Sequence, residues 1–389
     1  MKSNYRYIVK AFMAMAVIAG TTSCDDFLDR EPMSSISPET YYSTAAQLEA
    51  NLNDEYPNVL PSFGQWTYGI FGEDKGTDNQ IEVNANDRYT QDRWKVPHSE
   101  SDNWKFERIY RINFFLSEAL PKFGEDMSGS QNTISGSVAT IKHYIGEMYF
   151  LRAYEYFKKL QLFGDFPIIN QPLADEMEAL REASKRFPRN EVARFIISDL
   201  DKAYAYMSDV DMATTRINKD AAMLVKSRVA LFEATWLQNF KGTAFVPGGE
   251  GWPWASLHNN YQYPSGNLDN EVKYFLEQAV EASKLVADKY KGNLTENTGV
   301  LQQSADDPSN PYFDMFAQED LSDVKEVLLW RQYARGLSTH NINAAAGRGN
   351  YRIGLTRGFV QNFLMKDGTP VYAHGSYADG DGYYMGDKT

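Results

Sequence analysis

Apolar residues recur at helical spacing through much of this chain. Successive stretches place hydrophobic side chains three or four residues apart, which predicts amphipathic helices with one apolar face each. The apolar faces are Tyr41, Ala45, Leu48, Leu52; Ile109, Ile112, Leu116, Leu120; Ile145, Tyr149, Ala153, Phe157, Leu160; Val192, Phe195, Leu200, Ala203, Met207; Ala222, Val225, Val229, Phe232, Trp236; and Val272, Phe275, Ala279, Ala282, Val286. The expected N-terminal caps are Ser37, Ser101, Asn190, Asn218 and Asp269.

Helices of this kind cannot bury their apolar faces alone. Stacked helix pairs, as in tetratricopeptide-repeat (TPR) proteins, solve that problem. The regular repeat of about 34 residues that such proteins show is absent, and long inserts separate the helices. We therefore expect a mainly α fold with few short strands, in which irregular TPR-like helix pairs form a scaffold over about residues 38–290.

Three long stretches, 56–100, 240–268 and 292–320, interrupt the helical pattern. Loops this long are usually functional or disordered, and their tryptophan and tyrosine content argues against disorder. The run Glu326–Tyr333 predicts a strand, and the chain after it is rich in glycine and irregular. Since rigid scaffolds often present functional loops, we expect residues 291–389 to form a loop-rich, ligand-facing region.

Residues 1–23 differ from the rest of the chain. Basic residues precede the apolar run Ala11–Gly20, and no acidic residue occurs among them. This pattern predicts a secretory signal peptide, because a membrane span needs about 20 apolar residues. The sole cysteine, Cys24, follows directly in a stretch that resembles a bacterial lipobox, with Thr21 and Ser23 where other residues are commoner. We predict lipidation at Cys24; the alternative is an incidental small residue.

Several acyl chains on one cysteine would anchor the mature chain, residues 24–389, stably to a membrane. Asp25 and Asp26 resemble the acidic export signal that sends lipoproteins of Bacteroidetes to the cell surface. Without the three basic residues of the leader, 36 Lys and Arg remain against 52 Asp and Glu. This negative charge argues against nucleic acid or an anionic bilayer surface as a partner, so membrane contact is expected through the lipid anchor only.

Several segments carry a resemblance to one known family. They occur in the expected order along nearly the whole chain: Cys24–Pro32, Asn113–Leu116, Gly146–Phe157, Phe163–Pro167, Pro188-Arg189, Asp199-Leu200, Ala221–Trp236, and Gly358–Pro370 with Met365-Lys366-Asp367-Gly368. Together they resemble the SusD/RagB family of nutrient-binding lipoproteins.

The resemblance implies a SusD-like, TPR-like scaffold on the cell surface, anchored in the outer membrane. It also implies that the protein captures a nutrient and delivers it to a TonB-dependent (SusC-like) outer-membrane transporter without a cofactor. The nutrient is most often an oligosaccharide in this family, with peptides as the main exception. Family members usually continue well past the Met365–Gly368 motif, whereas this chain stops at Thr389. The resemblance therefore suggests that the ligand-facing region is incomplete.

Signals for catalysis are weak. The sequence has no common motif for nucleophilic, phosphate-binding or zinc chemistry, and its five histidines show no metal-ligand spacing, so no metal site is expected. Glycoside hydrolysis needs only two suitably placed carboxylates, and Glu73, Asp74 and Asp78 form an acidic cluster near Trp66 and Tyr68. This cluster is either a solvated loop, a sugar-binding site or a catalytic pair.

Aromatic side chains in loops are the best candidates for ligand contact, because sugar rings stack their apolar faces on flat aromatic surfaces. Our candidate platforms are Trp66, Trp94 and Trp254. Further candidate ligand contacts are Tyr68, Asp74, Asp78, Arg88, Arg93 and Arg335. The tryptophans expected in the core are Trp104, Trp236 and Trp330. The stretch Gly248–Trp254 could instead fold back onto the helix that ends near Phe240.

We therefore expect a non-enzymatic glycan-binding protein. Alternatives are a peptide-binding member of the same import system, a surface glycosidase that uses the acidic cluster, and an adhesion or assembly protein. A glycosidase would release sugar products, and an assembly protein would bind a protein in place of a nutrient.

Overall fold

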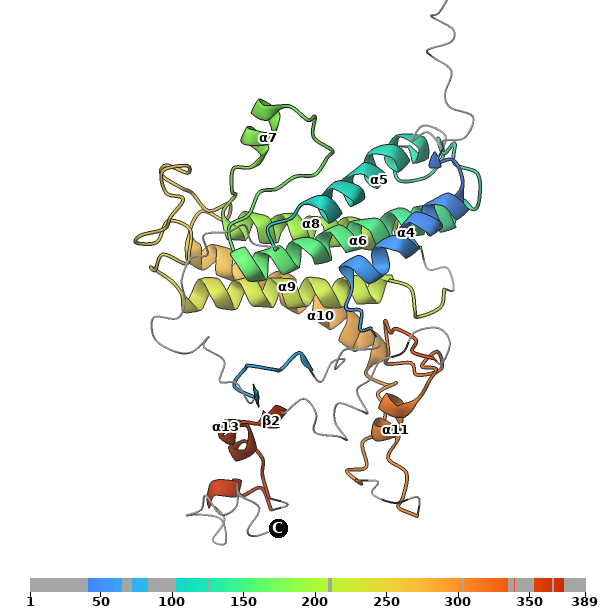
Figure 1. Cartoon of the computed structure of the whole chain (residues 1–389), viewed down its shortest axis with the longest axis vertical. Helices are drawn as coiled ribbons and strands as arrows, with labels where there is room; N and C mark the ends of the chain where they lie inside the picture. Colours follow the sequence, from blue (N-terminus) through green and yellow to red (C-terminus); the bar gives the residue numbers. More distant parts are fainter. Residues whose placement is uncertain are drawn as a thin grey trace, which may run out of the picture.

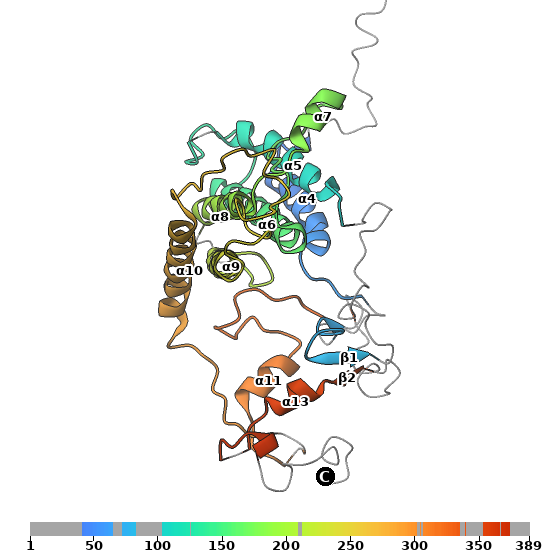
Figure 2. The same cartoon turned by 90° about the vertical axis from the view of Figure 1, so that its left-hand side faces the viewer.

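Long helices form one layer of the molecule, and loops with short elements form a second layer below it (Figures 1 and 2). The computed structural model describes residues 41–64, 72–82, 103–124, 126–208, 212–301, 306–334, 353–365 and 367–373, with residues 304 and 339. The long helices are α4 (Ala45–Val59), α5 (Glu107–Phe123), α6 (Val138–Phe163), α8 (Arg189–Tyr206), α9 (Lys219–Asn239) and α10 (Leu268–Tyr290). The expected mainly α fold is confirmed.

Helix α6 lies at the centre of the helical layer. It packs against α4 and α5 on one side and against α8 on the other, and the series continues through α9 to α10. Every residue from Ile145 to Ala153 is buried, as expected for a helix that has neighbours on all sides. Each helix thus covers the apolar face of the next, which is how irregular helix pairs bury their cores.

Gly146 allows α6 to approach the end of α8 closely. A Cβ atom at this position would lie 2.8 Å from the backbone nitrogen of Met207 and 2.9 Å from the carbonyl oxygen of Ala203. Such distances require one of the two helices to move, so the packing here depends on the missing side chain.

We expect Gly146→Ala to lower the free energy of unfolding by up to about 2 kcal/mol. Overpacking costs about 1–3 kcal/mol, and the better helix propensity of alanine offsets about 1 kcal/mol of it. Urea denaturation measures the change. The control is Gly358→Ala in the short helix α13 (Arg357–Gln361), where an added Cβ meets nothing within 4 Å. Equal stability of the two variants would contradict the packing argument.

The observed helix starts confirm some expected caps and correct others. The side chain of Asn218 accepts from the N–H of Ala221 and caps α9, as expected. Asp269 is not the cap of α10, because Asn267 takes that place. Helix α5 begins at Glu107, not at Ser101. The helix that carries Leu48 and Leu52 begins at Ala45 after a Thr44 capping box, and the expected start at Ser37 lies outside the described residues.

Asn190 was also expected as a cap, and this prediction was wrong. The residue lies inside the first turn of α8 and is fully buried. Its amide donates to Glu271 at 3.0 Å, and its side-chain oxygen accepts from the hydroxyl of Tyr261 at 3.0 Å. Tertiary partners on α10 and the preceding loop therefore use the side chain that the local pattern assigned to the helix end.

The second layer contains the short elements. Strands β1 (Gln80–Glu82) and β2 (Ile353–Leu355) pair antiparallel, with Ile81 opposite Gly354. Helices α11 (Pro311–Ala317), α13 and the 3₁₀ turn η3 (Val371–Ala373) lie in the same layer. Helix α7 (Met177–Ala183) is separate from them and projects from the helical layer (Figure 1).

The run Glu326–Tyr333 is not a strand, which corrects the sequence prediction. It forms turns and irregular chain, and it is attached to the loop before α9 by scattered bonds. The backbone N–H of Trp330 donates to the carbonyl of Thr214 at 3.2 Å, and Asn218 donates to the carbonyl of Leu328 at 2.6 Å. Its apolar residues pack on the helical core without a neighbouring strand among the described residues.

Candidate functional site

A cavity of about 380 Å³ opens where the end of α6 meets the start of α8 and the loop after α9. We call it the α6–α8 cavity. This junction is at the left end of the helical layer in Figure 1. The residues that line it are Gln161, Leu162, Phe163, Gly164, Asp165, Arg186, Arg189, Trp236, Ala244, Phe245, Pro253 and Trp254. Its volume lies within the range of about 300–1,000 Å³ that is typical of small-molecule sites.

A tight corner of the chain shapes one wall of the α6–α8 cavity. Helix α6 ends at Gly164, whose φ of 68° lies in the left-handed region that favours glycine. The carboxylate of Asp165 then accepts from the backbone N–H of Arg189 at 2.7 Å and from the indole N–H of Trp252 at 2.9 Å. Asp165 therefore joins the end of α6, the start of α8 and the loop after α9.

The loop after α9 folds back on that helix, which was the second possibility for Gly248–Trp254. The indole N–H of Trp236 donates to the carbonyl of Phe245 at 3.1 Å, and Trp252 is only 4% exposed. Trp254 is only half-buried, and its side chain lines the cavity. The fold-back therefore buries one tryptophan of the pair and leaves the other at a wall.

Flat aromatic surfaces make up much of that wall. Trp254, Trp236 and Phe163 are half-buried, and Phe245 is 62% exposed. No described residue accepts a hydrogen bond from the indole N–H of Trp254. Aromatic faces beside polar groups suit a ligand that has apolar faces and hydroxyl edges.

Arg186 lies between two tryptophan rings at the cavity wall. The guanidinium carbon is 4.4 Å from the ring centre of Trp104 and 4.8 Å from that of Trp254. Its Nη1 donates to the backbone carbonyl of Asp165 at 3.2 Å. Among the described residues no other acceptor bonds to this guanidinium. Cation–π contact with both rings restricts this side chain, and most of its N–H groups have no acceptor among the described residues.

Burial changes the ionisation of both polar groups at this corner. It lowers the pKa of Arg186, and the attraction of Asp165 does not fully reverse this change. Burial also raises the pKa of Asp165, against the bonds from Trp252 and Arg189. Both shifts show that the charges here are only partly compensated by their surroundings.

The second arginine of the wall is compensated. Arg189 binds Glu233 through two donors, Nε to Oε1 at 3.0 Å and Nη2 to Oε2 at 2.9 Å. Its guanidinium also lies 4.0 Å from the ring centre of Trp236. This pair fixes the orientation of the Trp236 ring and leaves Arg186 as the cation with donors to offer.

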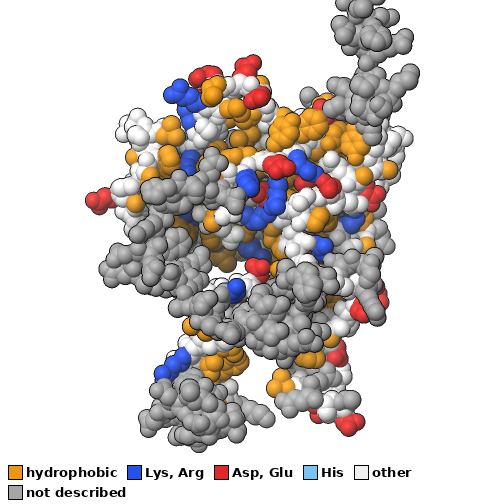
Figure 3. Space-filling view, viewed as in Figure 1, with side chains coloured by type: hydrophobic (Ala, Val, Ile, Leu, Met, Phe, Trp, Pro, Cys, Tyr) orange, Lys and Arg blue, Asp and Glu red, His pale blue; other side chains and the backbone are white. Residues whose placement is uncertain are grey.

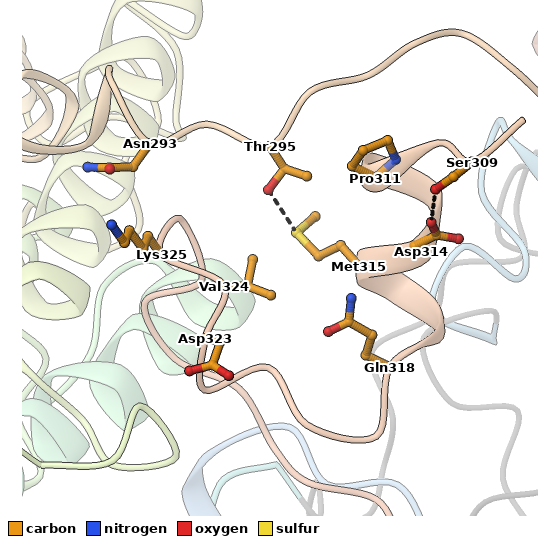
Figure 4. A pocket seen from close by; sticks show the side chains of 10 residues that line it. All are labelled: Asn293, Thr295, Ser309, Pro311, Asp314, Met315, Gln318, Asp323, Val324 and Lys325. Atoms are coloured by element: carbon orange, nitrogen blue, oxygen red, sulfur yellow. Dashed lines mark hydrogen bonds between the residues drawn. The ribbon is translucent and has the colours of Figure 1, made fainter.

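Another cavity, of about 420 Å³, lies in the second layer between residues 293 and 325 (Figure 4). Ser309 donates to Asp314 at 2.6 Å, and the hydroxyl of Thr295 points toward the sulfur of Met315. No aromatic ring is among its lining residues. It therefore lacks a flat surface for a sugar ring, and we consider the α6–α8 cavity the better candidate.

The described residues include three of the predicted ligand contacts. Trp254 lines the α6–α8 cavity, whereas Asp74 and Asp78 are exposed in the turn before β1, in the second layer. Trp254 and these two aspartates therefore do not share one site. The other predicted site residues lie outside the described residues: Cys24, Trp66, Tyr68, Arg88, Arg93, Trp94 and Arg335.

The turn before β1 holds its aspartates by their backbones. The carbonyl of Asp74 accepts from the hydroxyl of Thr77 at 2.6 Å, and that of Asp78 accepts from the hydroxyl of Thr356. Among the described residues, none donates to either carboxylate. Glu73, Asp74 and Asp78 are exposed, as in a solvated loop. A role of this acidic cluster in sugar binding stays a prediction.

The local sequence pattern does not mark all residues of the α6–α8 cavity. Trp104 and Trp236 were expected in the core, and both pack against it while half-buried. Trp236 also lines the cavity. Trp330 is half-buried as well, and its indole donates to the hydroxyl of Thr214 at 2.8 Å. Arg186 was not a candidate at all. No local pattern marks it, because its tryptophan partners come from distant parts of the sequence.

Charged side chains gather elsewhere on the helical layer as ion pairs. Figure 3 shows basic and acidic side chains next to one another in the middle of one face, over α5 and α6. Arg111 on α5 pairs with Glu55 on α4 at 2.5 Å, and Lys158 pairs with Glu155 within α6 at 2.6 Å. Glu155 also lies 3.9 Å from Arg108 and 3.4 Å from Lys159, so this one carboxylate is shared by three cations.

The described residues contain neither a membrane-spanning helix nor a cluster of metal ligands. No helix there has both the length and the apolar character to cross a membrane. Nor do three or more His, Cys, Asp or Glu side chains there come together in a way that could hold a metal ion.

Comparison with known proteins identifies relatives. The SusD-like protein P2 of Formosa agariphila is 25% identical over 257 residues, which cover 63% of this chain and 46% of that protein. SusD-like protein P38 of the same organism is 23% identical, over 70% of this chain and 51% of its own length. The chain therefore spans about half the length of these relatives.

Two solved structures share the fold. A SusD-like protein from Bacteroides fragilis matches with a TM-score of 0.54 at 19% identity, over 89% of this chain and 59% of that one. A SusD-like carbohydrate-binding protein from the same species matches with a TM-score of 0.50 at 14% identity, over 87% and 57%.

A family profile tests the resemblance directly. The SusD-like profile described as "Starch-binding associating with outer membrane" matches residues 26–231, which is more than half of the chain. This range includes the helices from α4 to most of α9. The chain belongs to the SusD-like family.

Proposed function

We propose that this protein is a non-enzymatic, lipid-anchored glycan receptor that captures an oligosaccharide at the cell surface. The α6–α8 cavity is the observation that carries this proposal. It combines the rings of Trp254 and Trp236 with the free donors of Arg186. Flat rings with a few polar groups beside them are what a sugar ring needs for stacking and orientation.

The family supports the cellular part of the proposal. Its description joins starch binding with association to the outer membrane. We propose that Cys24 carries the lipid anchor, and that the captured glycan passes to a TonB-dependent outer-membrane transporter. Co-purification of the native protein with such a transporter from detergent-solubilised outer membranes would support this step, and its absence from the purified complex would count against it.

Glycan capture is tested by a binding screen of the mature protein against plant, microbial and host glycans and a peptide mixture. Selective retention of one glycan without release of products supports the proposal. Released sugars would indicate a glycosidase, and retention of peptides alone would indicate a peptide receptor. Either result would overturn glycan capture.

We expect Trp254→Ala to weaken binding of the retained glycan about tenfold, since truncation of a tryptophan at the centre of a site commonly costs more than 1 kcal/mol. Isothermal titration calorimetry measures the affinity. The matched control is Phe316→Ala on α11, an aromatic side chain that is 72% exposed outside the cavity. Equal affinity of Trp254→Ala and the unchanged protein would show that the glycan binds elsewhere.

A further inference from the structure

Arg186 differs from the other arginines that are not exposed. Each of the others has a carboxylate partner at 2.5–2.9 Å, in the pairs Arg111–Glu55, Arg152–Asp199, Arg189–Glu233, Arg194–Glu271 and Arg216–Glu147. Within the described part of the chain, Arg186 alone among them has no carboxylate at such a distance, although Asp165 attracts it from farther away. Its hydrogen bond goes to a backbone carbonyl, and its guanidinium carbon lies 4.4 and 4.8 Å from the ring centres of Trp104 and Trp254.

The pKa directions agree with this difference. Burial alone lowers the pKa of a guanidinium, but for Arg152, Arg194 and Arg216 the facing carboxylate reverses the effect, and the pKa is raised. For Arg186 burial prevails, and the pKa is lowered. The carboxylate of Asp165 lines the same cavity and attracts Arg186, but the two form no close ion pair and burial still prevails. A half-buried cation that is only partly compensated in this way would be stabilised further by an anionic ligand.

We propose that the α6–α8 cavity selects glycans that carry an anionic group, a carboxylate or a sulfate ester, and that Arg186 binds this group. The inference rests on the proposed function, which is glycan binding at the same cavity. Planar guanidinium groups bind such oxygens through two parallel N–H donors, and the two rings restrict the side chain of Arg186. The sugar ring itself would lie against Trp254 or Trp236.

The net charge of the protein restricts the ligand further. The whole sequence carries a formal charge of −13, which repels long polyanions at a distance. The attraction of one arginine acts only over a few ångströms in water and salt. Short oligosaccharides with few charges are therefore the ligands that we expect.

The first experiment needs no variant. Affinities are measured by calorimetry for short oligogalacturonides as the free acid and as the methyl ester, for a sulfated oligosaccharide of similar length, and for a neutral malto-oligosaccharide. Because a hydrogen bond to a charged group contributes about 1.5–3 kcal/mol, we expect the free acid or the sulfated sugar to bind at least tenfold tighter than the methyl ester and the neutral sugar. Whichever of the free acid and the sulfated sugar binds more tightly shows whether the cavity prefers a carboxylate or a sulfate ester.

Variants then assign the effect to one residue. Arg186→Gln should reduce the affinity for the anionic sugar about tenfold and leave the affinity for the methyl ester unchanged. Arg186→Lys should have an affinity for the anionic sugar between those of Arg186→Gln and the unchanged protein. Arg181→Gln, at an exposed arginine on α7, is the matched control and should change neither affinity. Thermal denaturation checks that each variant is folded.

The outcomes separate the inference from the function on which it rests. Equal affinities for free acid, sulfated sugar, methyl ester and neutral sugar would overturn anion selection but leave glycan capture intact. Tight binding of an anionic sugar that Arg186→Gln does not weaken would overturn the role of Arg186. Binding of no glycan in any arm would overturn the proposed function and this inference with it.

Discussion

Replacing Arg152 by methionine is expected to lower the free energy of unfolding by about 3–5 kcal/mol, because it leaves a buried carboxylate without its partner. Arg152 is 3% exposed and Asp199 is fully buried. The Nε and Nη2 atoms donate to the two carboxylate oxygens at 2.6 and 2.9 Å. Nη1 also donates to the side-chain oxygen of Asn113 at 2.9 Å, so one residue joins α5, α6 and α8.

Urea denaturation followed by circular dichroism measures this effect. The double variant Arg152→Met/Asp199→Leu removes both charges and should recover a large part of the loss, since apolar replacement of a whole buried pair is often close to neutral. The control is Lys185→Met, which removes an exposed pair with Glu182 and should change stability by less than about 0.5 kcal/mol. A single variant as stable as this control would contradict the argument.

This pair explains why the sequence resemblance led to the fold and not to the ligand. Arg152 and Asp199 lie in two of the segments that resemble the family, and Asn113 lies in a third. All three side chains are used to hold the helices together. The α6–α8 cavity draws on both kinds of sequence. Phe163, Asp165 and Trp236 lie in family-like segments, whereas Arg186 and the loop residues Phe245 and Trp254 do not.

Helical periodicity predicted the scaffold well because burial follows spacing on one face. Of the five residues predicted to face the core on α10, Val272 is half-buried and the other four are buried: Phe275, Ala279, Ala282 and Val286. Local patterns failed where a distant partner decides the structure. Asn190 has the character of a cap, yet it binds Glu271, 81 residues away.

The same reason limits prediction of the site. Trp254 could be proposed from sequence because an aromatic residue in a loop is unusual enough to notice. Arg186 could not, because a single arginine has no local signal. Its significance comes from the lack of a close ion pair and from two rings that the fold brings together. Trp236 was assigned to the core by its helical face, although its ring also lines the cavity.

The second large effect is expected for Arg189→Met, and it should depend on pH. Glu233 is fully buried on α9, and its pKa is raised by burial although Arg189 acts to lower it. Removing the arginine removes the main attraction that opposes burial, so the pKa of Glu233 in the folded state should rise further. The unfolded chain keeps the ordinary value of about 4.3.

The sign follows from proton binding. A carboxyl group whose pKa is higher in the folded state binds its proton more tightly there, so stability is lost as pH rises from the unfolded value through the folded one. We therefore expect Arg189→Met to cost about 3–5 kcal/mol at pH 8, where Glu233 is a buried unpaired charge, and less at pH 5, because the raised pKa favours protonation of Glu233 as the pH falls.

Urea denaturation of the variant and the unchanged protein at both pH values measures the difference. The control Arg189→Met/Glu233→Gln removes the carboxyl group that titrates. The difference in the free energy of unfolding between this control and the unchanged protein should therefore not show the extra change between pH 5 and pH 8. An equal cost of Arg189→Met at pH 5 and pH 8 would show that Glu233 does not titrate in this range. Arg189 also lies against the ring of Trp236, which lines the α6–α8 cavity. Weaker glycan binding at pH 5 by Arg189→Met and by Arg189→Met/Glu233→Gln would show that the Arg189–Glu233 pair helps to shape this cavity.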